Sequence, residues 1–232
     1  MAYREYKGNL FASGAQTLVN TVNCVGVMGK GVALEFRYRF PRMFDEYKRT
    51  CEAHLLHPGQ ILAYRKEYPW ILNFVVKNDW RHASRIEWVE SCLQKFVESY
   101  RRLAITSIAL PWIGAMNGRL PWHQVHLLIR SYLSNLPDLS VELIEFDPSS
   151  PDPLYQRLIT IVSQMTVWEF AAATSLTEYA SMRVINSVRG QARSLSEIIS
   201  SAELGKKSVA SLYEFLHSYN SSSPLVAQRS LL

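Results

Sequence analysis

Residues 19–36 of this 232-residue chain read VNTVNCVGVMGKGVALEF. The β-branched residues at its start predict a strand, the glycines predict a loop, and the apolar spacing from Val32 to Phe36 predicts a helix. A strand that turns through a glycine-rich loop into a helix directs backbone N–H groups at an anion, most often a phosphate. The stretch matches neither the GxxxxGK(S/T) pattern of NTPases nor the GxGxxG pattern of dinucleotide-binding enzymes. It therefore predicts a nucleotide-like ligand outside both classes.

The alternation of strand-like and helix-like patterns continues to residue 147, which is typical of an α/β protein. WILNFVV at 70–76 and SIALPWI at 107–113 are apolar almost throughout, as in sheets covered on both faces. We therefore expect a three-layer α/β/α domain over residues 1–147. The expected strands are 3–7, 18–22, 60–64, 70–76, 106–111 and 141–146, and the expected helices are 32–39, 41–54, 84–103 and 122–136, with Pro41 in a first turn and Ser84 as an N-cap.

The segment DPSSPDP at 147–153 interrupts this alternation, because its prolines continue neither a helix nor a central strand. We expect a linker at 148–153, a small all-α domain over 154–220 and a disordered tail at 221–232. The expected helices of the second domain are 154–165, 168–175, 182–189, 195–201 and 208–217.

Composition excludes several classes of protein. The three cysteines lack CxxC spacing, which indicates reduced thiols rather than a disulfide frame or a zinc site. No run approaches the roughly 18 apolar residues that span a bilayer, and the first ten residues lack the apolar core of a signal peptide. We expect a cytoplasmic protein with no membrane segment, metal or cofactor. The net charge of +5 is compatible with a polyanionic partner but does not require one.

Two further stretches carry candidate chemistry. In NFVVKNDWRHAS, at 73–84, Lys77 follows a buried strand and precedes Trp80, so its amine is a candidate for desolvation and nucleophilic attack. The alternative is a surface lysine that pairs with Asp79. In ALPWIGAMNGRLPW, at 109–122, the glycines predict either a second phosphate-binding loop or a simple turn.

Together the three stretches resemble the macrodomain family, in particular its DNA-directed DarG-type branch. The resemblance is carried by VNTVNCVGVMGKGVALEF, the NFxxKxDWRxxS pattern and SIALPWIGAMNGRLPW, and it covers essentially the whole first domain. It implies a mixed central sheet with an ADP-ribose cleft at its carboxyl edge. It also implies a glycohydrolase that removes ADP-ribose from thymine bases in DNA, as the antitoxin to a DarT-type toxin.

By position, the resemblance implies that Lys77 is the catalytic residue and that Asn23 orients the distal ribose. Trp80, Arg81 and Arg119 are expected to contact DNA. The ADP-ribose-binding residues that it implies, with Asn9 near the adenine, are Asn9, Asn20, Val27, Met28, Gly29, Lys30, Gly31, Gly114, Ala115, Met116, Asn117 and Gly118.

The chemistry of an N-glycosidic bond suits a lysine. An amine at the anomeric carbon captures the positive charge of the ribose, whereas a protonated amine stabilises the departing base, and the sequence leaves both roles open. The only acid near these loops is Asp79, so the two-carboxylate arrangement of common glycosidases is not available.

The second loop departs from the family pattern G-(C/A)-G-x-G-G-L-x-W at two positions, Met116 and Arg119. A side chain at either position affects a backbone that approaches the ligand closely. The alternatives are therefore a non-catalytic reader of ADP-ribose or ADP-ribosylated DNA, and a protein-binding antitoxin or regulator.

The second domain resembles the C-terminal domain of the bacterial RNA polymerase α subunit, a helix-hairpin-helix type of module. The most specific part is LGKKS at 204–208, where a glycine turn opens a helix and lysines add positive charge. The alternative is a helical bundle that caps the first domain or mediates dimerisation. The DNA-facing residues that the resemblance implies are Arg183, Asn186, Gly205, Lys207 and Ser208.

Overall fold

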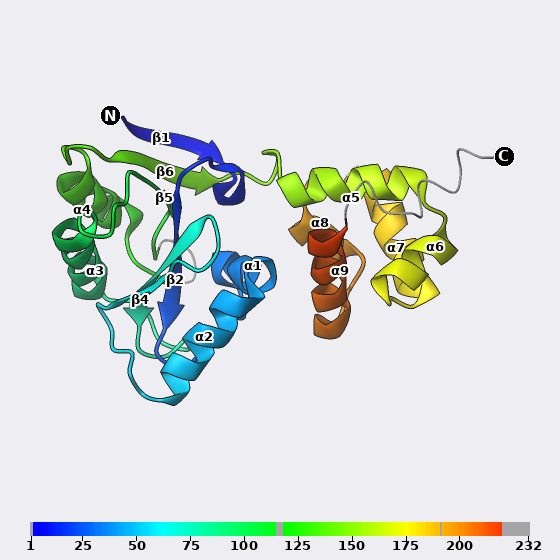
Figure 1. Ribbon diagram of the computed structural model, residues 1–232, viewed down its shortest axis with the longest axis horizontal. Coiled ribbons are helices and arrows are strands. Elements are labelled where there is room, and N and C mark those ends of the chain that lie inside the picture. Colours follow the sequence, from blue (N-terminus) through cyan, green and yellow to red (C-terminus); the bar gives the residue numbers. More distant parts are fainter. Residues whose placement is uncertain (1, 115–117, 191, 220–232) are drawn as a thin grey trace. The chain divides into compact units, whose positions relative to one another are not determined.

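The computed structural model describes residues 2–114, 118–190 and 192–219 (Figure 1). It divides into two compact units between Ser150 and Pro151, within the linker expected from the sequence. Three residues of the predicted ADP-ribose-binding set lie outside the described residues, as does the predicted tail at 221–232. These three are Ala115, Met116 and Asn117.

A six-stranded mixed sheet forms the centre of the first unit. The strand order is β1-β6-β5-β2-β4-β3, and β3 pairs antiparallel with β4 while the other neighbours pair in parallel. All six strands expected from the sequence are present, because each is an apolar or β-branched run that a covered sheet requires. The strands are β1 (Tyr3–Gly8), β2 (Thr17–Asn23), β3 (Ile61–Tyr64), β4 (Trp70–Lys77), β5 (Ser107–Pro111) and β6 (Ser140–Phe146).

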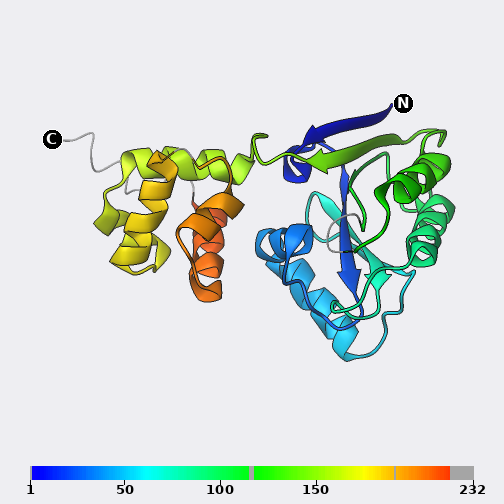
Figure 2. The same cartoon turned by 180° about the vertical axis from the view of Figure 1, so that it is seen from behind.

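Helices cover both faces of the sheet, which confirms the expected three-layer α/β/α fold (Figures 1 and 2). Side chains alternate along β4: Leu72, Phe74 and Val76 pack towards one helix pair, and Ile71 and Val75 towards the other. The first face is covered by α3 (Ile86–Ser99) and α4 (Trp122–Leu133), and the second by α1 (Gly31–Arg39) and α2 (Pro41–Glu52).

Two local features differ from the sequence prediction. Pro41 opens α2 as expected, but Ser84 is not the N-cap of α3, because α3 begins at Ile86 with Arg85 at its N-cap. The Ser84 N–H donates instead to the Gly118 carbonyl (3.0 Å), which holds Ser84 outside the helix. A short 3₁₀ helix, η1 (Leu10–Ala12), was not predicted; it is capped by the Asn9 side chain, which accepts from the Phe11 N–H.

The second unit consists, in its described part, of helices alone, as the sequence predicts. The Asp152 side chain caps α5, Thr166 and Glu169 form a capping box on α6, and Thr177 caps α7, which starts four residues earlier than expected. The helices are α5 (Pro153–Gln164), α6 (Val167–Thr174), α7 (Glu178–Arg189), α8 (Leu195–Ser201) and α9 (Lys206–Ser218). The fully buried side chains at their centre include Leu158, Ile161, Phe170, Val184, Leu195, Ile198, Leu212 and Leu216.

Candidate functional site

The carboxyl ends of β2 and β4 bring Asn23 and Lys77 together. The parallel register pairs Val22 with Val75 and then shifts by one residue, so that Asn23 lies opposite Lys77. The Cys24 N–H donates to the Asn78 carbonyl (3.1 Å), which continues the pairing beyond both strands. Two residues predicted to act on the same ribose therefore occupy adjacent positions at one edge of the sheet.

The environment of Lys77 favours the neutral amine. Its pKa lies below the usual value for lysine, chiefly because partial burial desolvates the ammonium group and also because Arg119 places a second positive charge nearby. A lowered pKa increases the fraction of lysine that carries a lone pair at neutral pH.

Asp79 does not offset this lowering of the Lys77 pKa, because its carboxylate is paired with the Arg81 guanidinium. Arg81 Nε and Nη2 donate to the two Asp79 oxygens at 2.9 and 2.6 Å, and the Arg81 N–H donates to one of them as well. These bonds hold the pKa of Asp79 well below its usual range, so it is ionised at neutral pH and is no proton donor. The sequence left two arrangements open: a desolvated Lys77, or a surface Lys77 that pairs with Asp79. The contacts of Asp79 with Arg81 support the first.

Asn23 organises the first glycine loop, residues 24–30. Its Oδ1 accepts from the Val25 and Val27 N–H groups at 3.0 and 3.3 Å, and its Nδ2 donates to the Val27 carbonyl at 2.6 Å. The Tyr47 hydroxyl, on α2, donates to the Asn23 carbonyl at 2.8 Å. The loop is thus shaped by a buried asparagine at the strand end rather than by its glycines alone.

The first loop ends at the N-terminus of α1, where backbone N–H groups are available to an anion. Lys30 is the N-cap and makes no side-chain cap hydrogen bond, and Gly31 has a φ of 57°, which favours glycine. Gly29 lies within the loop, where it has space for a side chain. Val27 is exposed at the rim, whereas Met28 is fully buried and anchors the loop in the core.

The second glycine loop closes on itself. The Leu120 N–H donates to the Gly114 carbonyl at 3.0 Å, and a Cβ at Gly118 would lie 2.4 Å from the Gly114 Cα, so only glycine fits there. Arg119 follows with a φ of 58°, a left-handed conformation that disfavours side chains. This explains why the family pattern has glycine at that position, and it makes Arg119 a strained, exposed cation beside the cleft.

The other predicted residues of the first unit lie along the same sheet edge or beneath it. Asn9 follows β1, and its side chain is occupied by the η1 cap. Asn20 is fully buried in β2, where it donates to Asn73 Oδ1 at 2.9 Å, so its side chain is not exposed to a ligand. Trp80 is 52% exposed, with the Arg81 guanidinium 6.0 Å from its ring centre.

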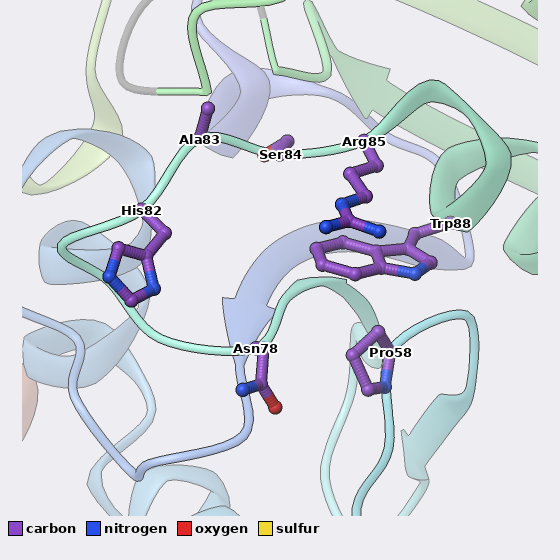
Figure 3. Close-up of a pocket in the computed structure, with 7 residues that line it drawn as sticks. All are labelled: Pro58, Asn78, His82, Ala83, Ser84, Arg85 and Trp88. Carbon is purple, nitrogen blue, oxygen red and sulfur yellow. The ribbon is translucent and has the colours of Figure 1, made fainter.

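A pocket of about 430 Å³ lies beside this edge, between the loop after β4 and the N-terminus of α3 (Figure 3). Sequence reasoning missed it, although the stretch at 73–84 contains four of its residues, because Pro58, Arg85 and Trp88 come from outside that stretch and complete the walls. It also missed Tyr47, whose spacing with Met43 and Cys51 reads only as a core face. The pocket is lined by Pro58, Asn78, His82, Ala83, Ser84, Arg85 and Trp88.

The predicted DNA-facing residues of the second unit lie at the α7–α8–α9 end of that unit. The guanidinium of Arg183 pairs with Glu203 (3.0 Å) and donates to the Ser201 carbonyl (3.1 Å), so it is held within the unit. Gly205 is the N-cap of α9 without a side-chain cap, Lys207 and Asn186 are exposed, and Ser208 is half-buried.

Within residues 2–114, 118–190 and 192–219, no group of three or more His, Cys, Asp or Glu side chains is arranged to hold a metal ion. The same residues contain no helix long and apolar enough to cross a membrane.

Comparison with known proteins identifies the family of the first unit. Residues 19–129 match the Macro domain family. The solved structure of the macrodomain of Thermus aquaticus DarG is 42% identical, with a TM-score of 0.57, and the match covers 62% of this chain and 97% of that one. The chain belongs to the macrodomain family, in its DarG-type branch. The predicted fold and family are thereby confirmed.

Two further relatives of this macrodomain carry informative names. A curated Thermus aquaticus protein, 42% identical over 146 residues that cover 61% of this chain, is named DNA ADP-ribosyl glycohydrolase. A solved structure of Thermosipho africanus DarTG in complex with ADP-ribose is 34% identical, with a TM-score of 0.57, over 64% of this chain and 42% of that one. The chain spans 41% of the length of the curated Thermus relative.

Proposed function

We propose that this protein is a DNA ADP-ribosyl glycohydrolase that removes ADP-ribose from thymine bases. The observation that carries the proposal is the pairing of Lys77 with Asn23 at the carboxyl ends of β4 and β2, beside the first glycine loop and with Arg119 of the second glycine loop near Lys77. The name of the Thermus aquaticus relative supports the reaction, and the ADP-ribose complex of the Thermosipho africanus relative supports the ligand.

In this proposal the two glycine loops hold the diphosphate of ADP-ribose. The first contributes the N–H groups at the start of α1, and the second contributes the turn closed between Gly114 and Leu120. Asn23, fixed by Val25, Val27 and Tyr47, keeps the first loop in shape at the distal ribose. The ligand thus meets donors that are already in position, which lowers the cost of ordering them on binding.

Lys77 then acts as the nucleophile. Its neutral amine attacks the anomeric carbon, a nitrogen–carbon bond forms, and the bond to the thymine nitrogen breaks with its electron pair on the base. The base takes up the proton that the alkylated lysine nitrogen loses. Water next hydrolyses the ribosyl–lysine bond and frees ADP-ribose and the lysine. The lowered pKa of Lys77 supports this role, since attack needs the neutral amine and a lower pKa raises the fraction of that form.

The proposal extends to the partner and location of the protein. A curated Thermosipho africanus protein that is 34% identical over 149 residues is named as a fusion of DNA ADP-ribosyl transferase and glycohydrolase. A DarT-type transferase is therefore the proposed toxin whose modification this chain reverses, and the cytoplasm, where bacterial DNA lies, is the proposed location.

The test uses a single-stranded oligonucleotide with one ADP-ribosylated thymine. Incubation with the wild-type protein is expected to yield free ADP-ribose and the unmodified oligonucleotide, both identified by mass spectrometry. A protein that binds the modified oligonucleotide and leaves it intact is a reader, and that result would overturn the proposal.

A further inference from the structure

The pocket beside the cleft has the composition of a nucleotide site, and the proposed cleft for ADP-ribose does not use it. Its walls combine apolar surfaces from Pro58 and Trp88 with the cationic Arg85 and the polar His82 and Asn78 (Figure 3). None of its seven lining residues, all within the described part of the chain, is acidic. An anion with an attached ring is therefore the class of ligand that its chemistry fits.

One end of the pocket suits a phosphate group. Ser84 is only 5% exposed, and its hydroxyl has no hydrogen-bond partner among the described residues. An unsatisfied buried hydroxyl is costly unless a ligand completes it. Helix α3, which follows directly, has 14 residues and begins without a side-chain cap, so its first N–H groups add to the attraction for an anion. Arg85 supplies a full positive charge at the same point.

The other end suits a base. The Arg85 guanidinium lies over the Trp88 ring, 5.1 Å from its centre, and its second face is a plane on which a base can stack. The Pro58 wall is held in place by Gly59, whose N–H donates to the Val75 carbonyl at 2.8 Å and which packs closely on Ser91 of α3. These contacts tie the Pro58 wall to both β4 and α3.

The pocket also adjoins the strand end that carries Lys77. Asn78 lines it and directly follows Lys77, and the Cα atoms of neighbouring residues are about 3.8 Å apart. Ser84, on the far wall, is hydrogen-bonded through its N–H to Gly118 of the second glycine loop. The pocket therefore borders both the strand end that carries Lys77 and the second glycine loop.

We propose that this pocket binds the nucleotide next to the modified thymine in single-stranded DNA, with its phosphate at Ser84 and Arg85 and its base on the Arg85–Trp88 stack. The inference rests on the proposed function, since it takes the modified thymine to lie at Lys77. It predicts a preference for a modified oligonucleotide over the modified nucleoside alone.

The test compares kcat/KM for ADP-ribosylated thymidine and for an oligonucleotide with the same modified base. Arg85→Ala is expected to lower the ratio of kcat/KM for the oligonucleotide to kcat/KM for the nucleoside about tenfold, because a charged contact is lost. Ser84→Ala is expected to lower the same ratio about threefold, because a neutral contact is lost. The matched control is Arg65→Ala, which removes an arginine stacked 4.0 Å from Trp70 at the opposite end of β4 and is expected to keep the wild-type ratio. In Arg85→Ala the salt dependence of oligonucleotide binding should also weaken, because one phosphate contact is lost.

The measurements distinguish a failure of the pocket proposal from a failure of the proposed function. If the wild type cleaves both substrates but Arg85→Ala and Ser84→Ala keep its ratio, the pocket proposal is wrong and the proposed function stands. If the wild type cleaves neither substrate, the affinities for the modified oligonucleotide and for ADP-ribose are compared by fluorescence anisotropy. Tighter binding of the oligonucleotide that Arg85→Ala abolishes supports the pocket proposal. Tighter binding that persists in Arg85→Ala refutes it. Ser84→Ala deletes a buried hydroxyl that has no partner among the described residues, so its thermal unfolding temperature should be equal to or higher than that of the wild type, which excludes a folding defect.

Discussion

The two loops that flank the end of β4 are built in opposite ways. In the loop at 24–30, the polar atoms of Asn23 are bonded to the loop itself and to Tyr47. In the loop at 78–85, the Ser84 hydroxyl has no partner among the described residues, and Trp80 is half exposed. The loop at 24–30 has its shape before binding, while the loop at 78–85 presents polar groups whose hydrogen bonds a ligand would complete. This difference indicates a fixed site for the reacting sugar beside an open surface for the attached strand.

The largest effect on the rate of cleavage is expected at Lys77, the last residue of β4. Lys77→Ala should lower the single-turnover rate of cleavage by at least about 10³-fold, because the nucleophile is lost. The affinity for ADP-ribose, measured by calorimetry, should change only a few-fold, since the glycine loops remain. Lys66→Ala, which removes an exposed lysine paired with Glu46, is the control and should leave both quantities unchanged. Equal rates for Lys77→Ala and the wild type would refute the assigned role.

Loss of the fixed loop shape is the next largest effect. Asn23→Ala removes three loop hydrogen bonds and should lower the rate about 10²-fold and the free energy of unfolding by about 2 kcal/mol. Tyr47→Phe removes only the hydroxyl and should cost about 1 kcal/mol by denaturant unfolding. If Asn23→Ala keeps the wild-type rate, preorganisation of the first loop does not contribute to cleavage.

Arg119 tests the electrostatic link between the second glycine loop and Lys77. Its charge lowers the pKa of Lys77, so Arg119→Gly should raise that pKa, move the rising limb of the pH–rate profile to higher pH and lower the rate at pH 7 a few-fold. The same change should stabilise the fold by about 1 kcal/mol, because glycine accepts a φ of 58° without strain. Arg119→Lys keeps the charge and should keep the wild-type profile; a shift in both variants would contradict the link.

The smallest effect is expected in the second unit. If α9 contacts a DNA phosphate, Lys207→Ala should weaken binding of unmodified DNA about twofold and reduce its salt dependence by roughly one phosphate contact. Arg183→Ala is the comparison, since Arg183 is already paired with Glu203 and should contribute less. Unchanged affinity at low salt for both variants would remove the DNA-binding interpretation of this unit.

The sequence predicts the sheet and the glycine loops because these depend on local patterns. Apolar strands and Pro41 at a helix start are recognisable within a few residues. The pairing of Asn23 with Lys77 follows instead from a register shift between strands distant in the sequence. The displacement of Ser84 from the helix N-cap likewise depends on Gly118, in another loop. Long-range hydrogen bonds of this kind leave no local signal, which is why the pocket could not be predicted.

The most direct test of the account is to trap the bond between Lys77 and the ribose. Attack by the amine gives a ribosyl–lysine adduct whose open-chain imine cyanoborohydride reduces to a stable amine. With the modified oligonucleotide as substrate, we expect mass spectrometry of the wild-type protein to show ADP-ribose attached to the peptide that contains Lys77, and none in Lys77→Ala. Undiminished turnover in the presence of the reductant, with the Lys77 peptide unmodified, would contradict the account.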